Sequence, residues 1–344
     1  MNTTTIAVDV AKSVFEVAVS IHPGQVRERH RLSREAFGRF LGAHPPATVL
    51  MEACGSAHHW ARHAQSHGHR VVLVAPHVVR PYVVRNKTDR TDAKGLLEVF
   101  RNEDVQPVPV KSPTQQALAA LHRLRSTWLA TRTARLNTVR GLLREFGLVI
   151  PVGARHVVPH VRAVLEDADA AIPGLLRPAL AAAMEEIGDL DTRIRAIERQ
   201  LEAAAADSVA AGQLRTIPGI GLLTATALVA TVGDVQRFPS ARHFASYLGL
   251  TPREHSSGAR RHLGAISKRG DTYGRMLLIH GARAVLWHAK AKAASSPDRL
   301  RTWALQLERL RGHNKAAVAL ANKLARIAWA VWRRGTPFAV VPAV

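Results

Sequence analysis

The sequence predicts a mixed α/β domain followed by a largely helical region. In residues 1–111 the apolar residues alternate between a period of two and a period of 3.6, as in a sheet covered by helices. Residues 112–207 carry two long amphipathic helical patterns, and residues 208–344 are helical in pattern and strongly basic. With 344 residues, 47% of them hydrophobic, the chain can form two or three cores. We therefore expect three parts with these boundaries.

The first part has the element order of a ribonuclease-H-like (RuvC-like) domain. Three predicted strands come first, and helices and strands then alternate, which favours a mixed sheet covered by helices. In a sheet of that strand order, the first and fourth strands end side by side. The predicted strands are 6–8, 15–19, 26–31, 48–51 and 71–74, and the predicted helices are 34–41, 56–67 and 92–100.

The middle part predicts an antiparallel coiled-coil arm. One long helix runs from about Pro113 to Gly147, and a second runs from about Leu175 to Ala206 with apolar residues in near-heptad register. Pro151, Pro159 and Pro173 interrupt the chain between them. Such an arm often serves oligomerisation, and packing within one subunit is the alternative.

The third part is predicted to be helical throughout and contains a turn of the helix-hairpin-helix kind. In Pro218-Gly219-Ile220-Gly221, the two glycines permit a tight turn whose free N–H groups can meet a phosphate. The alternative is a sharp turn between packed helices. Four tryptophans at helical spacings predict core packing rather than base stacking: Trp287, Trp303, Trp329 and Trp332.

The charge distribution indicates a polyanionic partner. The formal net charge is +22, and residues 208–344 hold 21 Lys and Arg against 5 Asp and Glu. Only 9 of the 48 basic residues are Lys, and the Arg guanidinium suits bidentate phosphate contacts. A high-GC genome would explain Arg over Lys, but not the regional excess over Asp and Glu. Nucleic acid is the commonest such partner.

Composition also excludes several classes. The sequence contains no run of 18 or more apolar residues, so we expect no membrane span. The start of the sequence does not resemble a secretion signal. The single cysteine, Cys54, rules out an internal disulfide and a cysteine zinc site, and we expect a small buried apolar residue there. The expected location is cytoplasmic, in association with the nucleoid.

Four carboxylates are placed to share metal ions. Asp9 ends the first predicted strand, and Glu52 ends the fourth. Asp89 and Asp92 are three residues apart near a helix start, so both can face the same way. Hard oxygen ligands suit Mg²⁺ or Mn²⁺, and two such ions would stabilise both oxygens of a phosphoryl displacement. Singly, Asp89 and Asp92 could be helix caps, and Glu52 could be a surface charge.

A serine pair in the basic third is the other candidate for chemistry. Ser256 and Ser257 precede Gly258, and a serine in such a turn is usually structural. Four nearby cations could hold a scissile phosphate and offset charge in the transition state: Arg260, Arg261, Lys268 and Arg269. His59, His63 and His67 have a zinc-like spacing without the expected Glu, so we interpret them as a helix face.

Several stretches together resemble the DEDD insertion-sequence transposases, relatives of the pilin-gene invertase that include bridge-RNA-guided recombinases. The N-terminal motifs are Ile6-Ala-Val-Asp9, Met51-Glu52-Ala-Cys-Gly55 and Asn86-Lys-Thr-Asp89-Arg-Thr-Asp92. The C-terminal motifs are Ile217-Pro-Gly-Ile-Gly221, Phe244-Ala-Ser-Tyr-Leu-Gly-Leu-Thr-Pro252, Ser257-Gly258 and Ser267-Lys-Arg-Gly270. The likeness runs in order from near the N-terminus to about Pro337. It departs at His255, where Tyr is common, and at Gly55-Ser56-Ala57-His58.

The resemblance implies a DNA recombinase with a phosphoserine intermediate. Asp9, Glu52, Asp89 and Asp92 match the family's metal-binding tetrad, and Ser257 matches its nucleophile, with Ser256 as the fallback. Family members act as homo-oligomers, here a dimer or tetramer, in which the acidic site of one subunit meets the serine of another. Their DNA partners are the element ends and the target site, and some members use a structured guide RNA.

Two rival functions remain open at this stage. A metal-dependent junction resolvase would use water, with Ser257 only a turn residue. A non-catalytic nucleic-acid-binding protein would keep its function when the four carboxylates are neutralised.

Overall fold

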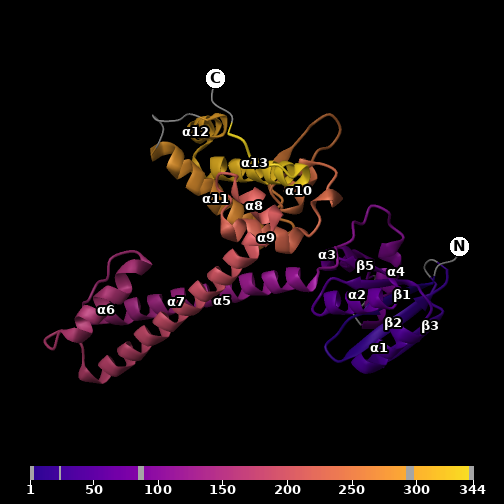
Figure 1. Cartoon of the computed structure of the whole chain (residues 1–344), viewed down its shortest axis with the longest axis horizontal. Helices are drawn as coiled ribbons and strands as arrows, with labels where there is room; N and C mark the ends of the chain where they lie inside the picture. The colour runs from indigo at the N-terminus through magenta and orange to yellow at the C-terminus, as the bar shows by residue number, and fades with distance from the viewer. Residues whose placement is uncertain (1–3, 23–24, 84–88, 292–297, 341–344) are drawn as a thin grey trace. The chain divides into compact units, whose positions relative to one another are not determined.

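The computed structural model describes residues 4–22, 25–83, 89–291 and 298–340, and gives side chains for these except residues 89–90. The chain divides into two compact units, Met1–Ser112 and Pro113–Val344 (Figure 1). No helix within the described ranges is long and apolar enough to cross a membrane.

The N-terminal unit is built on a five-stranded mixed sheet with the order β3-β2-β1-β4-β5. β1 pairs in parallel with β4 and antiparallel with β2, and β4 pairs in parallel with β5. The predicted mixed sheet is therefore confirmed, including the neighbouring ends of its first and fourth strands. The strands are β1 (Thr5–Asp9), β2 (Val14–Ser20), β3 (Glu28–Ser33), β4 (Thr48–Glu52) and β5 (Arg70–Val74).

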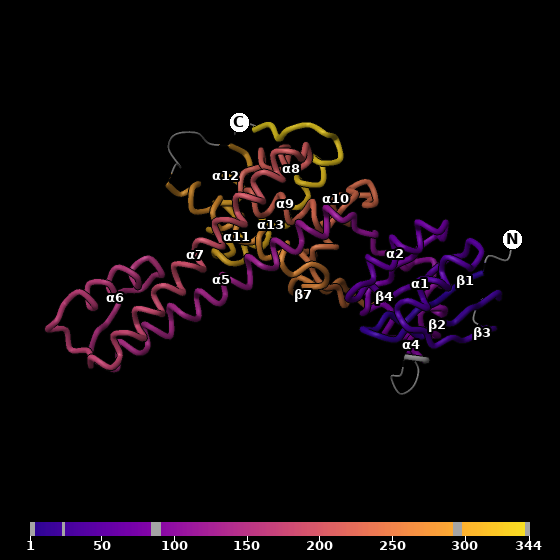
Figure 2. The backbone as a smooth tube through the Cα atoms, turned by 60° about the horizontal axis from the view of Figure 1, so that its bottom comes forward, coloured from indigo at the N-terminus to yellow at the C-terminus, as the bar shows by residue number. Residues whose placement is uncertain are grey.

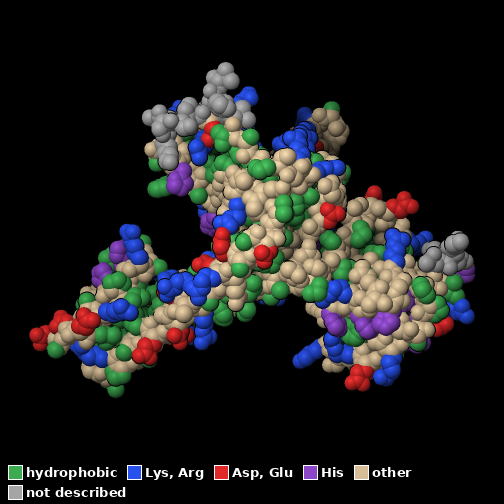
Figure 3. Space-filling model, viewed as in Figure 1, with side chains coloured by type: hydrophobic (Ala, Val, Ile, Leu, Met, Phe, Trp, Pro, Cys, Tyr) green, Lys and Arg blue, Asp and Glu red, His purple; other side chains and the backbone are tan. Residues whose placement is uncertain are grey.

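Helices cover both faces of this sheet, because the side chains of its inner strands alternate between two cores. On one face, Val8 and Met51 pack with α1 (Arg34–Ala43) and α2 (Ala57–Ser66). On the other face, Leu50 joins Ala7 and the apolar residues of α4 (Asp89–Phe100). Two short elements lie between β5 and α4: α3 (Pro76–Val79) and the 3₁₀ turn η1 (Arg80–Tyr82). Histidine side chains, purple in Figure 3, gather on the visible face of this unit.

The C-terminal unit begins with two long helices that run side by side in opposite directions (Figures 1 and 2). α5 (Pro113–Glu145) and α7 (Arg177–Ala206) enclose an apolar core with α6 (Val157–Glu166). At the other end of the pair, Leu118, Ile197 and Leu201 pack with Ala230 of α9. The pair is thus joined to the helical body by a shared core. Two 3₁₀ turns flank α6: η2 (Ala154–His156) and η3 (Gly174–Leu176).

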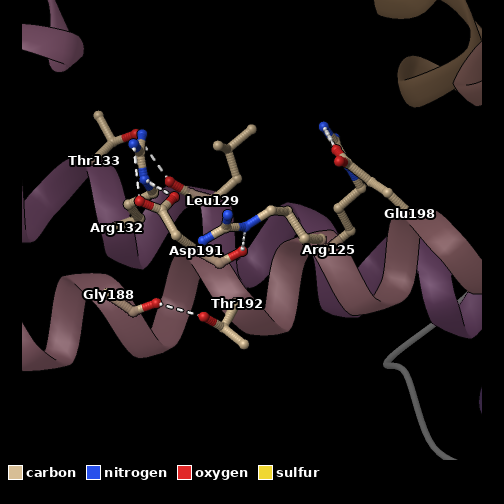
Figure 4. A network of polar contacts seen from close by, with 9 residues as sticks. Arg125, Leu129, Arg132, Thr133, Gly188, Asp191, Thr192 and Glu198 are labelled. Carbon is tan, nitrogen blue, oxygen red and sulfur yellow. Dashed lines mark hydrogen bonds and ion pairs between the residues drawn. The ribbon is translucent and has the colours of Figure 1, made fainter.

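Ion pairs fix the antiparallel register of α5 and α7. Arg125 Nη2 lies 2.7 Å from Glu198 Oε1, and Arg132 pairs with Asp191 further along (Figure 4). A third pair, between Arg135 and Glu186, continues the series. Basic and acidic side chains are interspersed along this pair in Figure 3.

The remaining helices form a body around one large core. Trp303, Trp329 and Trp332 pack partly buried against this core as predicted, whereas Trp287 is 66% exposed, so its predicted burial is wrong. The elements are α8 (Val209–Arg215), α9 (Leu222–Val232), η4 (Val235–Arg237), α10 (Ala241–Tyr247), β6 (Pro252–Glu254), β7 (Leu263–Ile266), α11 (Thr272–Ala291), α12 (Arg299–Arg311) and α13 (His313–Arg334).

The hairpin of β6 and β7 corrects the prediction that this part is helical throughout. Pro252 cannot donate a helical hydrogen bond, and the glycines that follow disfavour helix, so the basic run pairs as short strands instead. Ser257 and Arg260 exchange backbone hydrogen bonds across a two-residue turn at the tip. The hairpin carries the serine pair away from the helical core.

The glycine turn between α8 and α9 lies against α11. A Cβ at Gly219 would come 2.8 Å from the carbonyl oxygen of Gly281, so this turn is in close backbone contact with the neighbouring helix. Gly221 is exposed at the N-terminus of α9, with open space around it. Packing between helices accounts for Gly219, while Gly221 faces outward.

Candidate functional site

Two carboxylates stand at adjacent strand ends in the N-terminal unit. Asp9 is the last residue of β1 and Glu52 is the last residue of β4. Val8 is in register with Met51, so the following residues, Asp9 and Glu52, leave the sheet at the same edge. Neighbouring strands lie about 4.8 Å apart, so the two carboxylates begin close together.

Strand alternation directs both carboxylates toward α4. Asp9 shares a face with Ala7, and Glu52 shares that face with Leu50, because residues two apart point the same way. Ala7 and Leu50 pack in one core with Ala93 of α4. Asp92 immediately precedes Ala93 and is only 8% exposed. The fold therefore brings Asp9, Glu52 and Asp92 to one face of the sheet.

A cavity of about 1030 Å³ opens at this edge, and both Glu52 and Asp92 line it. His77 and Arg80 also line it, so a positive group shares the cavity with the carboxylates. The cavity combines carboxylate oxygens with a cation, which suits an anionic substrate held through positive charge.

The pKa of the Cys54 thiol is affected by the nearby carboxylates. Burial raises the pKa of its thiol, and Glu52 and then Asp9 raise it further. The thiol is only half-buried and donates to the carbonyl of Val10 at 3.6 Å. The prediction of a buried apolar residue was thus wrong in degree: Cys54 packs against the core beneath α1 and α2 but is only partly buried.

Carboxylate oxygens are hard ligands of the kind that a divalent cation takes, and Asp9, Glu52 and Asp92 share one face of the sheet. Asp89 is the first residue of α4, one turn before Asp92, and its side chain lies outside the described residues. So do residues 86–88 of the same motif. Within the described side chains, no group of three His, Cys, Asp or Glu is close enough to hold a metal, and this includes the histidines of α2.

The two serines of the C-terminal hairpin have different surroundings. The Ser256 hydroxyl donates to Glu254 Oε1 at 2.7 Å and accepts from the His262 N–H at 3.2 Å. In the described part of the chain, the hydroxyl of Ser257 makes no hydrogen bond, and the residue is exposed at the hairpin tip. Ser256 thus holds the two strands together, and Ser257 offers a hydroxyl to solvent.

Glu254 is a poor candidate for a general base. The hydrogen bond from Ser256, followed by that from Arg261, holds the pKa of Glu254 below its usual value. Arg261 Nε lies 3.2 Å from Glu254 Oε1, which orients this arginine along the hairpin. Arg260 is exposed beside the turn and is free to meet a phosphate.

The basic loop that follows the hairpin is fixed to the helical body. Lys268 and Arg269 are exposed, yet the Lys268 N–H donates to the carbonyl of Gly249 at 3.1 Å. Arg275 is 8% exposed and donates to the carbonyls of Leu248, at 3.0 Å, and Arg269. A buried guanidinium thereby sets the position at which two surface cations are presented.

Comparison with known proteins decides the family. Residues 6–147 match the DEDD transposase family of IS110, and residues 211–296 match the transposase IS116/IS110/IS902 family. A probable family 20 transposase of Pseudomonas aeruginosa is 42% identical over 337 residues, which cover 98% of each chain. The chain belongs to the IS110/IS116/IS902 transposase family. It is a DNA transposase of an insertion sequence, and phosphodiester strand transfer is the reaction that the family implies.

Other relatives span the same length. The transposase of insertion element IS1111A from Coxiella burnetii is 37% identical, over 96% of this chain and 89% of its own. A pilin gene-inverting protein of Moraxella lacunata is 26% identical over 98% of both chains. The predicted family is thus confirmed, and its DEDD-type domain suggests dependence on a divalent metal.

Sequence reasoning did not identify three residues that shape the site region. Glu254 and Arg275 are described above, and His122 of α5 is the third. His122 is 4% exposed and contacts the Tyr273 hydroxyl at 3.1 Å and Thr226 Oγ1 at 3.0 Å. Glu254 ends β6 two residues before Ser256, so it would have been found had the hairpin been predicted. Arg275 and His122 bond to residues that are distant in sequence, so no local sequence pattern predicts these contacts.

Proposed function

We propose that this transposase cuts and rejoins DNA through a metal-assisted phosphoserine intermediate formed on Ser257. The observation that carries the proposal is the contrast between the two serines: Ser256 is occupied by Glu254, whereas Ser257 is exposed beside Arg260. The three carboxylates that share one face of the N-terminal sheet support the metal-assisted part. The carboxylates and the serine belong to different units of the chain.

Each side chain has a distinct role in this proposal. Asp9, Glu52, Asp89 and Asp92 would hold Mg²⁺ or Mn²⁺, which supplies positive charge against the scissile phosphate. Four cations would bind the phosphates on either side: Arg260, Arg261, Lys268 and Arg269. Gly221, at the N-terminus of α9, would add backbone N–H donors, with Gly219 setting the turn.

The reaction exchanges one phosphodiester for another. The Ser257 oxygen attacks phosphorus, the bond from phosphorus to a deoxyribose oxygen breaks, and the proton lost by serine ends on the released hydroxyl. In the second step, the hydroxyl of another strand attacks the phosphoserine and returns the proton to Ser257. Bond energy is conserved, so neither step needs ATP.

We further propose that the carboxylates of one subunit and the serine of another act on the same phosphodiester in a dimer or tetramer. The pair of α5 and α7 would serve as the coiled-coil arm of that assembly, because its exposed leucines, Leu124, Leu129 and Leu142, leave apolar surface uncovered. A structured guide RNA is the proposed second nucleic-acid partner, which the excess of basic residues after position 208 supports.

The test is a covalent adduct between protein and DNA on a denaturing gel. Ser257→Ala should abolish the adduct, whereas Ser256→Ala should keep it at reduced yield, because only the hairpin anchor is lost. An adduct that persists in Ser257→Ala and disappears in Ser256→Ala would reverse the assignment. Cleavage without any adduct in the unmodified protein would instead indicate attack by water.

A further inference from the structure

A groove of about 1070 Å³ lies between the hairpin strand β7 and the helices α12 and α13. Its apolar surface includes Ile266 of β7, Trp303 of α12 and Val318 of α13. The volume is slightly above the range of about 300–1000 Å³ for sites that bury a small organic ligand. The groove therefore accommodates flat apolar groups of the size of one or a few bases.

The rim of this groove is positively charged. Lys315, Lys323 and Arg326 line it, and none of its described lining residues is Asp or Glu. These cations follow one face of α13 over 11 residues, or about 16 Å of helix at 1.5 Å per residue. Stacked nucleotides of one strand are about 3.4 Å apart, so a few consecutive phosphates could follow this face.

Lys323 lies beside an aromatic ring and close to other cations. Lys323 Nζ lies 4.0 Å from the centre of the Trp303 ring. Burial lowers the pKa of Lys323, and Arg326 and then Arg299 lower it further. A phosphate beside Lys323 and Arg326 would relieve this repulsion, and a base could pack along the apolar wall beside them.

The groove continues to the hairpin that carries the serines. A second hollow of about 350 Å³ shares Pro252, Asn322 and Arg326 with the groove. Its other lining residues include Glu254, which accepts a hydrogen bond from Ser256, and Arg261, which pairs with Glu254. One continuous surface therefore leads from the apolar groove to the base of the serine hairpin.

We propose that this groove, lined by Ile266, Trp303, Lys315, Lys323 and Arg326, binds an unpaired stretch of the DNA strand next to the phosphodiester being cut. The proposal rests on the proposed function, because that function places a DNA strand at the hairpin. Bases in a duplex are stacked inside and cannot reach an apolar wall, whereas unpaired bases can. The apolar floor of the groove can contact the bases of an unpaired strand, and the cationic rim can contact its phosphates.

The binding test uses full-length Ser257→Ala protein, in which no adduct on this serine can form, so failure of the proposed chemistry would not affect it. The probes are a mixed-sequence 12-nucleotide DNA strand, the same sequence as RNA, and a 12-base-pair duplex. Lys323→Gln with Arg326→Gln should weaken DNA-strand binding about tenfold and duplex binding less than about twofold. The slope of the logarithm of the binding constant against the logarithm of salt concentration should fall in magnitude by about 1.4, because each contact to a single-strand phosphate contributes about 0.7. The control is Arg309→Gln with Arg311→Gln, which removes two exposed cations of α12 outside the groove.

Three outcomes would overturn the proposal: equal losses for groove and control variants, equal losses for strand and duplex, or tighter binding of RNA than of DNA. A second measurement does not depend on the folding of any groove variant. A strand containing 5-iododeoxyuridine is photocrosslinked to the parent protein, and the attachment site is mapped by mass spectrometry. Attachment at Trp303, within β7 or at the groove residues of α13 supports the groove, whereas attachment confined to other segments refutes it.

Discussion

Gly270→Ala tests whether the basic loop depends on close backbone packing. Gly270 has a φ of +83°, and a Cβ there would lie 1.9 Å from the carbonyl oxygen of Tyr247. Contacts below 3.0 Å do not occur, so the loop must move by about 1 Å. That shift adds about 1–3 kcal/mol of overpacking, and about 1 kcal/mol more if the bond from Lys268 to Gly249 is lost.

The matched control is Gly335→Ala at the end of α13. Its backbone is also left-handed, with φ +70° and ψ +19°, but the nearest atom to a Cβ at this position would be 3.8 Å away. Both variants carry the left-handed penalty of about 1–2 kcal/mol. The difference in unfolding free energy, measured by urea denaturation, should therefore be about 1–4 kcal/mol. Equal values for the two variants would refute the packing argument.

Three further predictions concern the carboxylates, the helix pair and a buried histidine. Asp9→Asn should abolish metal-dependent strand exchange and leave DNA affinity, measured by gel shift, largely intact; equal loss of both would assign Asp9 to folding. Asp191→Arg should lower the unfolding free energy by about 1 kcal/mol, and adding Arg132→Asp should restore most of it, because the two residues form a partly exposed ion pair and such pairs contribute up to about 1 kcal/mol. Burial, followed by Arg125, lowers the pKa of His122 to about 4, so its stabilising effect is complete above pH 6.5 and is lost as the pH falls toward 4. In His122→Gln, the decrease in unfolding free energy between pH 6.5 and pH 4 should be smaller by on the order of 3 kcal/mol. An unchanged decrease would contradict this role for His122.

The sequence predicted the N-terminal sheet well because its signals are local. β4 is a continuous apolar run, and the Ser33 hydroxyl caps α1 by accepting from Ala36, so short stretches determine both elements. The hairpin was missed because its strands have three and four residues and no apolar face to alternate.

The site was predicted only in part, for reasons of distance along the chain. Asp9 and Glu52 could be placed together because both end strands of one sheet. The anchoring of Ser256 by Glu254, and of the basic loop by Arg275, depends on hydrogen bonds that form only in the folded chain. Burial of Trp287 was wrong because helical spacing in an apolar run does not say which face a neighbouring helix covers.

The exposed hairpin has a consequence for how a tethered DNA end could travel. Its two strands are short, and nearly all of their residues face solvent, so opening them locally disturbs little of the helical interior. If Ser257 carries a DNA end as proposed, we therefore expect that end to be able to move toward a new partner strand while the helices α8–α13 stay folded. Only the roughly dozen residues of the hairpin would then move, and the helices would hold its base in place.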